Sequence, residues 1–285
     1  MGYSVIIIIG APRSGTNMLR DILVKLPGVG TWPCDEINYI WRHGNMWYPS
    51  DELPAEMAND TVKKYVNDQV ELLAEKLELD TVIEKTCANS LRVGFVDKVI
   101  PTAKYIYIVR DGMDVVGSAL KRWRAKIDFK YIIKKARYVP FSDVPYYAYK
   151  FITNRFFQMF SGEKRLAFWG PVMNNTTELL KKHTLLEVCA MQWKACVDNA
   201  EHDLKRIPDE RKIFIKYEDF VNNPIGEYKR LANFIGKPTT SEIEHEVQSM
   251  VKSGSVGKGR SELSIDEQKN VHELICEQLD KYGYG

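Results

Sequence analysis

Short apolar runs alternate with amphipathic stretches along the chain, and this alternation predicts strands separated by helices. The apolar runs are only four or five residues long and are rich in β-branched side chains, as is typical of buried strands. We expect strands at Val5–Ile9, Thr81–Glu84, Tyr105–Val109 and Lys212–Lys216. Because strands that alternate with helices form a mostly parallel sheet covered on both faces, the pattern predicts a three-layer α/β fold.

The clearest helical pattern covers Thr61–Leu79, where apolar residues recur at helical spacing and charged residues occupy the other face. Apolar periodicity and capping residues predict seven further helices. They are Gly15–Leu26, Ser90–Val99, Asp111–Arg124, Thr176–Arg206, Pro224–Ile235, Ser241–Val251 and Ile265–Lys281. The connection Val251–Leu263 contains three glycines and little apolar content, so we expect a mobile loop there.

Composition places the chain among globular proteins. Its 285 residues are 45% hydrophobic, enough for a substantial core, and we expect one domain over residues 1–285. A net charge of +2 gives no global reason to expect nucleic acid or a membrane surface as a partner. Five widely spaced cysteines without a C-x-x-C pair favour a reducing compartment over a disulfide framework or a zinc site.

The apolar run at the N-terminus is too short for the core of a signal peptide and far too short to cross a membrane. We therefore expect no transmembrane segment. The chain is expected to be a cytoplasmic enzyme or a soluble catalytic domain.

A glycine-framed loop follows the first strand and resembles a phosphate cradle. Gly10 and Gly15 have the G-x-x-x-x-G spacing of nucleotide-binding loops, in which backbone N–H groups converge on phosphate oxygens. An NTPase would continue with Lys and then Ser or Thr to hold the terminal phosphates and Mg²⁺. This chain instead has Thr16 and Asn17, with Arg13 inside the loop. The loop predicts a P-loop-like fold but disfavours metal-dependent transfer from ATP.

The letters PRSGT, Pro12 to Thr16, resemble the 5′-phosphosulfate loop of sulfotransferases that use 3′-phosphoadenosine 5′-phosphosulfate (PAPS). The segment Tyr105–Leu120 resembles a second family motif, in which the residues corresponding to Arg110 and Ser118 grip the 3′-phosphate of the donor. Arginine at the end of a strand suits bidentate phosphate binding. The alternative is an Arg110–Asp111 ion pair that caps a helix, with Ser118 merely packed.

Two further segments resemble donor-binding motifs of the same family. Lys252–Ser264 resembles the glycine-rich basic loop that closes over the 3′-phosphate and adenine, with Gly257, Lys258, Gly259 and Arg260 at the matching positions. Many bacterial members have Trp where this chain has Gly259, which puts a packing role of that Trp in doubt here. The alternative is a solvated, flexible basic loop.

The segment KYEDF, residues 216–220, resembles a Y-E-D motif and makes Tyr217 a candidate for donor contact. We leave Glu218 and Asp219 out of the site, because acidic side chains would repel a bisphosphate.

The resemblance also assigns catalytic roles. Arg13 and the N–H groups of Ser14, Gly15, Thr16 and Asn17 would bind the leaving 5′-phosphate and the sulfuryl oxygens. Lys85, in IEKT, would stabilise the transition state from the opposite side, unless it is a surface lysine paired with Glu84.

Glu36 is the candidate general base, at a position resembling the catalytic glutamate of carbohydrate and tyrosylprotein sulfotransferases. Asp35 and His43 are its rivals.

The motifs span residues 5–264 in the order of the family, so the chain is interpreted as a PAPS-dependent sulfotransferase, nearest in pattern to bacterial, carbohydrate and tyrosylprotein members. It would sulfate a hydroxyl or amine of a carbohydrate, glycolipid, small molecule or peptide tyrosine, without a metal. The alternatives are a degenerate nucleotide-binding protein of the same fold and a P-loop kinase.

Residues 125–170 are interpreted as a helical, aromatic insertion that binds the acceptor or forms a lid. Eight basic residues and one acid, Asp128, lie between Lys121 and Arg137, and eleven aromatics lie between Tyr138 and Trp169. Aromatic faces suit sugars or phenols, and the basic stretch could receive an acidic ligand. Alternatively, the aromatics form a core beneath a helical cap and the lysines its solvated face.

Overall fold

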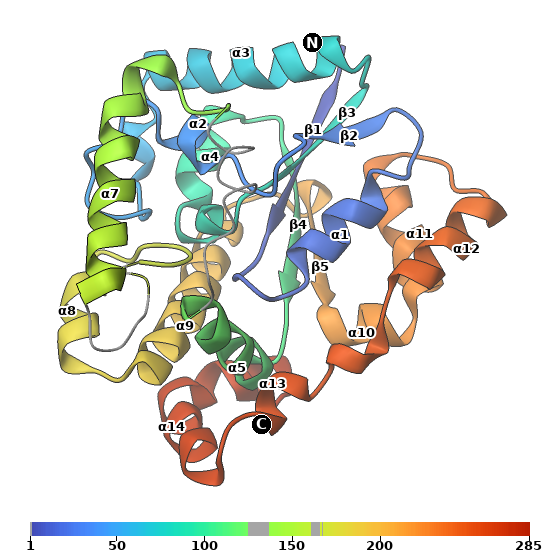
Figure 1. The fold of residues 1–285 in the computed structure, drawn as a ribbon. Helices are drawn as coiled ribbons and strands as arrows, with labels where there is room; N and C mark the ends of the chain where they lie inside the picture. Colours follow the sequence, from blue (N-terminus) through green and yellow to red (C-terminus); the bar gives the residue numbers. More distant parts are fainter. Residues whose placement is uncertain (1, 125–136, 161–165, 167) are drawn as a thin grey trace.

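The computed structural model describes residues 2–124, 137–160, 166 and 168–285. The described residues form a five-stranded parallel sheet of order β2-β3-β1-β4-β5 (Figure 1). Its strands are β1 (Ser4–Ile9), β2 (Val29–Thr31), β3 (Thr81–Lys85), β4 (Lys104–Val109) and β5 (Lys212–Lys216). The sequence predicted all of them except β2, which has three residues, too few to show a period of two.

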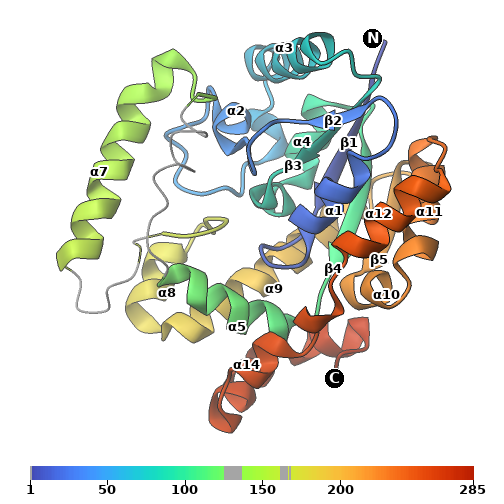
Figure 2. The same cartoon turned by 45° about the vertical axis from the view of Figure 1, so that its right-hand side comes forward.

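Helices cover both faces of this sheet (Figures 1 and 2), which confirms the three-layer α/β prediction. Alternate residues of β1 point to opposite layers: Ile6 and Ile8 to one core, Ile7 and Ile9 to the other. The first core packs against α1 (Thr16–Leu23), α10 (Tyr217–Asn222), α11 (Pro224–Ile235) and α12 (Ser241–Met250). The second packs against α3 (Asp60–Lys76), α4 (Val93–Val99), α5 (Gly112–Trp123), α9 (Leu185–Leu204) and α14 (Ile265–Tyr282).

Two predicted helices begin or divide differently in the structure. The predicted helix Thr176–Arg206 is two helices, α8 (Thr176–Lys182) and α9, because Thr184 and Glu187 form a capping box that starts α9. The predicted helix Ser90–Val99 begins as a 3₁₀ turn, Cys87–Leu91, and only then continues as α4. Other 3₁₀ turns cover Ala55–Met57, Phe141–Asp143, Asp209–Arg211 and Ser253–Ser255.

The segment predicted to be a mobile loop contains a short helix, α13 (Lys258–Ser261), held against α5. The buried Asp114 carboxylate accepts hydrogen bonds from the N–H groups of Gly257 (2.7 Å) and Arg260 (3.0 Å). A Cβ at Gly259 would lie 2.1 Å from the carbonyl oxygen of Asp114, so this position excludes any side chain. The backbone of α5 therefore occupies the space that a tryptophan side chain at this position would need.

The region of the predicted insertion contains α7 (Val144–Phe160), which lies to one side of the sheet layers (Figure 2). Its Tyr147 ring packs edge-on against Tyr39 of α2 (Asn38–Arg42), with centroids 4.5 Å apart. Phe141 and Phe156, however, are 94% and 59% exposed, so part of the aromatic set is not core. Most of the basic stretch, including Asp128, lies outside the described residues.

Among the helices that the structure describes, none has the length and apolar character that a membrane crossing requires.

We predict that Gly259→Ala destabilises the fold, because the added Cβ must push α13 away from the α5 backbone. The free energy of unfolding should fall by about 1–3 kcal/mol in urea titrations followed by circular dichroism. Gly254→Ala is the matched control, since a Cβ there meets no atom within 4 Å, and it should change stability by less than about 0.5 kcal/mol. Equal stability of the two variants would contradict the close contact.

Candidate active site

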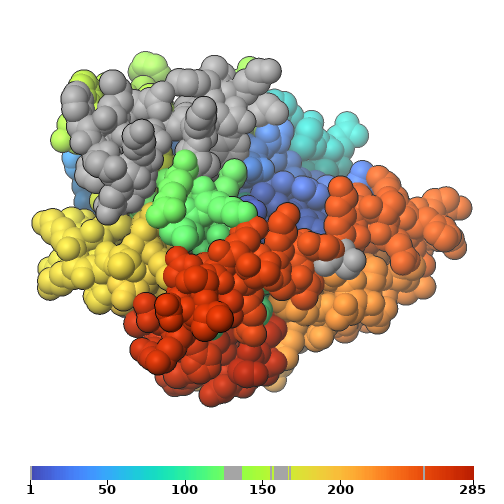
Figure 3. All heavy atoms as spheres, turned by 60° about the horizontal axis from the view of Figure 1, so that its bottom comes forward, coloured from blue at the N-terminus to red at the C-terminus, as the bar shows by residue number. Residues whose placement is uncertain are grey.

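A cavity of about 670 Å³ opens at the carboxyl ends of the strands. Residues Pro12–Met18 follow β1, Lys85 ends β3, Arg110 follows β4 and Tyr217 follows β5. Figure 3 shows three segments that are far apart in sequence meeting on this face: the N-terminal segment in blue, α5 in green and the C-terminal segment in red. Parallel α/β sheets bind their ligands at this edge, so the cavity is the candidate active site.

The loop after β1 is shaped to receive an anion. Gly15 adopts φ +91°, and a Cβ there would lie 2.4 Å from the Tyr217 ring, so only glycine fits. Helix α1 starts at Thr16 without a side-chain cap, which leaves its first N–H groups for a ligand. The buried Ser14 hydroxyl has no hydrogen-bond partner among the described residues. These features predict a phosphate or sulfate at the N-terminus of α1.

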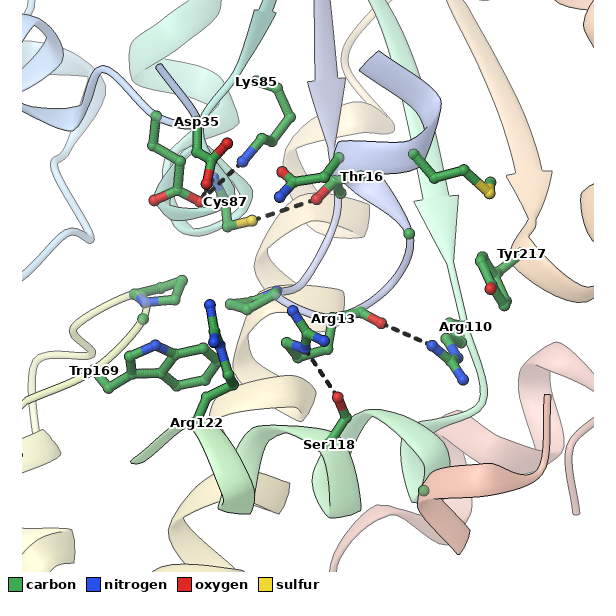
Figure 4. Close-up of a pocket in the computed structure, with 18 of the residues that line it drawn as sticks. Arg13, Thr16, Asp35, Lys85, Cys87, Arg110, Ser118, Arg122, Trp169 and Tyr217 are labelled. Atoms are coloured by element: carbon green, nitrogen blue, oxygen red, sulfur yellow. Dashed lines mark hydrogen bonds and ion pairs between the residues drawn. The ribbon is translucent and has the colours of Figure 1, made fainter. Parts of the chain in front are cut away.

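Arg13 stands in the left-handed region at φ +73°, a conformation that costs a non-glycine residue about 1–2 kcal/mol. Its Nε donates to Ser118 Oγ at 2.9 Å, and its carbonyl oxygen accepts from Arg110 Nη1 at 3.2 Å (Figure 4). Arg13 thus contacts both residues expected to hold the 3′-phosphate, Ser118 through its guanidinium and Arg110 through its carbonyl oxygen.

Arg110 is fixed by its neighbours rather than by the predicted alternative partner, Asp111. Its Nη2 pairs with Asp114 at 2.9 Å, and its guanidinium lies 4.4 Å from the centre of the Tyr217 ring. Asp111 instead caps α5 by accepting from the Met113 N–H. The helix-capping ion pair between Arg110 and Asp111 is therefore not formed, and Arg110 lines the cavity.

Lys85 and Glu36 form an ion pair in the wall of the cavity, with Nζ and Oε1 3.3 Å apart. The Lys85 side chain is 2% exposed and that of Glu36 is 27% exposed. Lys85 is therefore not a surface lysine. Glu84, its alternative partner, is fully buried and accepts a hydrogen bond from Asn89. Burial alone would lower the pKa of Lys85, but Glu36 and Cys87 outweigh it and raise that pKa, so the lysine stays charged.

Cys87 also borders the cavity but is not activated. Its N–H donates to Glu36 Oε1 at 3.3 Å, and its thiol lies 3.6 Å from Thr16 Oγ1. Burial, reinforced by Glu36, raises the pKa of the thiol to about 12. Because a thiolate is the reactive form, Cys87 positions Glu36 and is not a nucleophile.

Positive charge dominates the cavity. Six cationic side chains line it against three carboxylates: Arg13, Lys85, Arg110, Lys121, Arg122 and Lys258, with Asp35, Glu36 and Glu262. Desolvation in the cavity, followed by the charges of Arg122 and Arg110, lowers the pKa of Arg13. Such crowding of like charges is relieved by a bound anion. No group of three or more potential metal ligands occurs in the part of the chain that the structure describes.

The rivals of Glu36 have other partners. Asp35 lines the cavity but pairs with the mostly buried Arg20 at 3.3 Å. His43 is not among the residues that line it, and its Nδ1 lies 2.9 Å from the buried Asp143 carboxylate. His43 therefore connects α2 to the turn before α7, and Glu36 is the better placed of the three.

Three predicted donor residues are close to the cavity but do not line it. Ser14 is buried beneath the loop, and Gly257 caps α13. Arg260 turns toward Asp111 and the carbonyl of Tyr284, both at 3.4 Å. The other predicted residues, Arg13, Gly15, Thr16, Asn17, Glu36, Lys85, Arg110, Ser118, Tyr217, Lys258 and Gly259, all line it.

Sequence reasoning missed several lining residues. Arg122 lies one helical turn after Ser118 on α5, so helical periodicity from Ser118 could have found it. The sequence indicated Trp169 only as one of the aromatics of the predicted acceptor-binding insertion, and Asn38 carries no such signal. Asn38 is placed by a buried network in which Asp51 accepts from it at 3.1 Å and Arg92 donates to it at 2.5 Å.

We predict opposite orders of stability at two arginines. At Arg13, glycine should be more stable than alanine by about 1 kcal/mol, because glycine adopts positive φ without strain. At Arg122, inside α5, alanine should be more stable than glycine by about 1 kcal/mol because of helix propensity. Urea unfolding of the four variants measures both differences, and the same order at both sites would contradict the strain at Arg13.

We also predict that Glu36→Gln lowers the pKa of Lys85. Without the carboxylate, burial becomes the dominant effect and opposes the charged ammonium. Lysine ¹³Cε chemical shifts followed against pH would report the change. Glu262→Gln removes the partner of the exposed Lys121 and serves as the control that leaves the pKa of Lys85 unchanged. An unchanged pKa in Glu36→Gln would show that the pair does not govern Lys85.

Solved structures of similar fold include two sulfotransferase domains. One, from the curacin biosynthetic pathway, has a TM-score of 0.55 at 15% identity and covers 96% of this chain and 98% of its own. The other, from the Synechococcus olefin synthase, has a TM-score of 0.57 at 14% identity and covers 100% of this chain and 97% of its own. At these identities the likeness shows the fold.

Comparison of sequences points the same way. A Caenorhabditis briggsae protein named "Putative protein-tyrosine sulfotransferase" is 26% identical over 131 residues. The match covers 41% of this chain and 43% of that relative, so this chain matches less than half of the relative's length. The family model described as the sulfotransferase domain matches residues 4–274, nearly the whole chain. The chain therefore belongs to the sulfotransferase family.

Proposed function

We propose that this protein transfers the sulfuryl group of PAPS to a hydroxyl group of an acceptor, with Glu36 as the general base. One observation carries the proposal: a loop suited to an anion, the residues Arg110 and Ser118, and a Lys85–Glu36 ion pair converge in one cavity at the ends of parallel strands. A donor with two phosphate groups matches two adjoining clusters of cationic and N–H groups, which the Arg13–Ser118 hydrogen bond connects.

The residues present fit such a donor. Its 5′ end would be held by Arg13 and the N–H groups of Gly15, Thr16 and Asn17, where the Ser14 hydroxyl lies buried without a partner among the described residues. Its 3′-phosphate would be held by Arg110, Ser118 and Lys258. Asp114 fixes both Arg110 and the N-terminal end of α13, so a single carboxylate aligns this second cluster. The bound donor would supply a sulfuryl group joined to a phosphate that can leave as a stable anion.

Side chains of the protein would then position the acceptor and stabilise the charges that develop during transfer. Glu36 takes the proton of the acceptor hydroxyl as the acceptor oxygen bonds to sulfur and the bond from sulfur to the 5′-phosphate oxygen breaks. Lys85 stays charged beside Glu36 and stabilises negative charge on the transferred oxygens. Arg13 neutralises the leaving 5′-phosphate. Precise placement and electrostatic stabilisation would supply most of the rate.

We predict that Glu36→Gln reduces kcat by about 10²–10⁴-fold, the range expected for loss of a general base. The affinity for adenosine 3′,5′-bisphosphate, measured by titration calorimetry, should change little because Glu36 pairs with Lys85, which lies across the site from Arg110 (Figure 4). Turnover is followed as transfer of ³⁵S from labelled PAPS to a panel of phenolic, sugar and peptide acceptors.

His43→Asn is the matched control, because His43 does not line the cavity, and it should retain turnover. Turnover that survives in Glu36→Gln but disappears in Asp35→Asn would transfer the role of base to Asp35. Failure of the wild-type protein to bind the bisphosphate would overturn the donor assignment. Binding without turnover on any acceptor would identify a nucleotide-binding protein that has lost transfer.

A further inference from the structure

Helix α5 displays a row of polar side chains along the cavity. Asp114, Ser118 and Arg122 are spaced four residues apart and therefore share one face of the helix, about 6 Å apart along its axis. Asp114 holds Arg110, and Ser118 accepts from Arg13, so both belong to the proposed donor site. Arg122 lies one turn further from Arg110, where Figure 4 places it on the side of Trp169.

Arg122, unlike three other cations of the cavity, has no carboxylate partner among the described residues. Lys121 pairs with Glu262 at 2.5 Å, Lys85 with Glu36, and Arg110 with Asp114. No carboxylate or hydrogen-bond acceptor of the described residues contacts the Arg122 guanidinium, although it lines the cavity and its charge lowers the pKa of Arg13. Arg122 is exposed, and an anionic ligand bound to it would relieve its repulsion with Arg13 and match the planar donors of its guanidinium.

The wall next to Arg122 is rigid and apolar. The buried Gln192 donates from Nε2 to the carbonyl oxygens of Trp169 (2.9 Å) and Pro171 (2.8 Å), which fixes the turn between them. The Trp169 ring packs edge-on against the fully buried Trp123, with centroids 6.4 Å apart. A tryptophan fixed in this way offers a flat surface to a sugar or aromatic ring.

We infer that the acceptor is a hydroxylated ring compound that carries an anionic group, with Arg122 binding the anion and Trp169 packing against the ring. The inference rests on the proposed function, since it assigns this end of the cavity to the acceptor. An aryl or a sugar ring meets the requirement, and both present a hydroxyl that Glu36 can deprotonate.

Binding to the protein saturated with adenosine 3′,5′-bisphosphate tests the inference by calorimetry. Tyramine, tyrosol and 4-hydroxyphenylacetate share one phenol and carry at the far end a positive ammonium, a neutral hydroxyl and a negative carboxylate. Methyl glucoside and methyl glucuronide form the neutral and anionic sugar pair. In one of the two series the anion should bind at least about tenfold more tightly than its neutral partner, and that series identifies the ring.

Variants assign the preference to residues. Arg122→Gln should reduce the preference for the anion to less than about twofold, and Arg122→Glu should reverse it, in the phenol series toward tyramine. Trp169→Leu should weaken neutral and anionic ligands alike, because the ring contact does not depend on charge. Arg124→Gln is the matched control: it removes the same charge from an exposed arginine outside the cavity and should leave the preference intact.

The outcomes separate the inference from the proposed function. A wild-type protein that binds the bisphosphate but none of the five compounds, or binds them without regard to charge, overturns the inference alone. A preference for the anion that survives in Arg122→Gln also overturns the inference. So does a loss of more than about tenfold in the affinity of Arg122→Gln for the bisphosphate, because it would place Arg122 in the donor site. A wild-type protein that does not bind the bisphosphate overturns both.

Discussion

The parallel register of β1, β3 and β4 is the constraint on which the site depends. Ile8 of β1 pairs with Lys85 at the end of β3, and Ile9 pairs with Tyr107 near the end of β4. The glycine-framed loop, Lys85 and Arg110 therefore lie together at the carboxyl edge of the sheet. If one of the three strands shifted its register, the residues at its end would move away from the other two. The buried isoleucines of β1 resist such a slip, because moving the strand by one residue would exchange the faces of its side chains.

Six cationic side chains meet in the cavity at the carboxyl edge of the sheet. Carboxylates pair with some of these cations and leave others available to bind a ligand. Asp114 and Glu36 do this at opposite sides of the cavity: Asp114 fixes Arg110 and the N-terminal end of α13, and Glu36 keeps Lys85 charged. Neither carboxylate reaches Arg13 or Arg122 among the contacts of the described residues. The charges without carboxylate partners therefore point to where anionic groups of ligands would bind, and the paired ones hold the walls.

Burial makes these pairs costly to break. Asp114 is fully buried, and removing either partner of a buried ion pair leaves the other charge without water or compensation. The same reasoning applies to the buried network around Asp51. Burial alone would raise the pKa of Asp51, but the charges of Arg92 and Arg42 outweigh burial and lower that pKa. This network positions Asn38 at the start of α2.

The sequence by itself determined the strands long enough to show a pattern, the P-loop-like fold, and the place of residues that follow strands directly, such as Arg110 and Tyr217, at one edge of the sheet. These predictions succeeded because strand, turn and helix signals are local, and a parallel sheet brings its strand ends together whatever the loops do. Only the tertiary structure decided the partners: Lys85 with Glu36 rather than Glu84, Arg110 with Asp114 rather than Asp111, and Gly259 against the backbone of α5. Those choices depend on side-chain direction and on contacts between segments distant in sequence, and neither leaves a periodic trace in the chain.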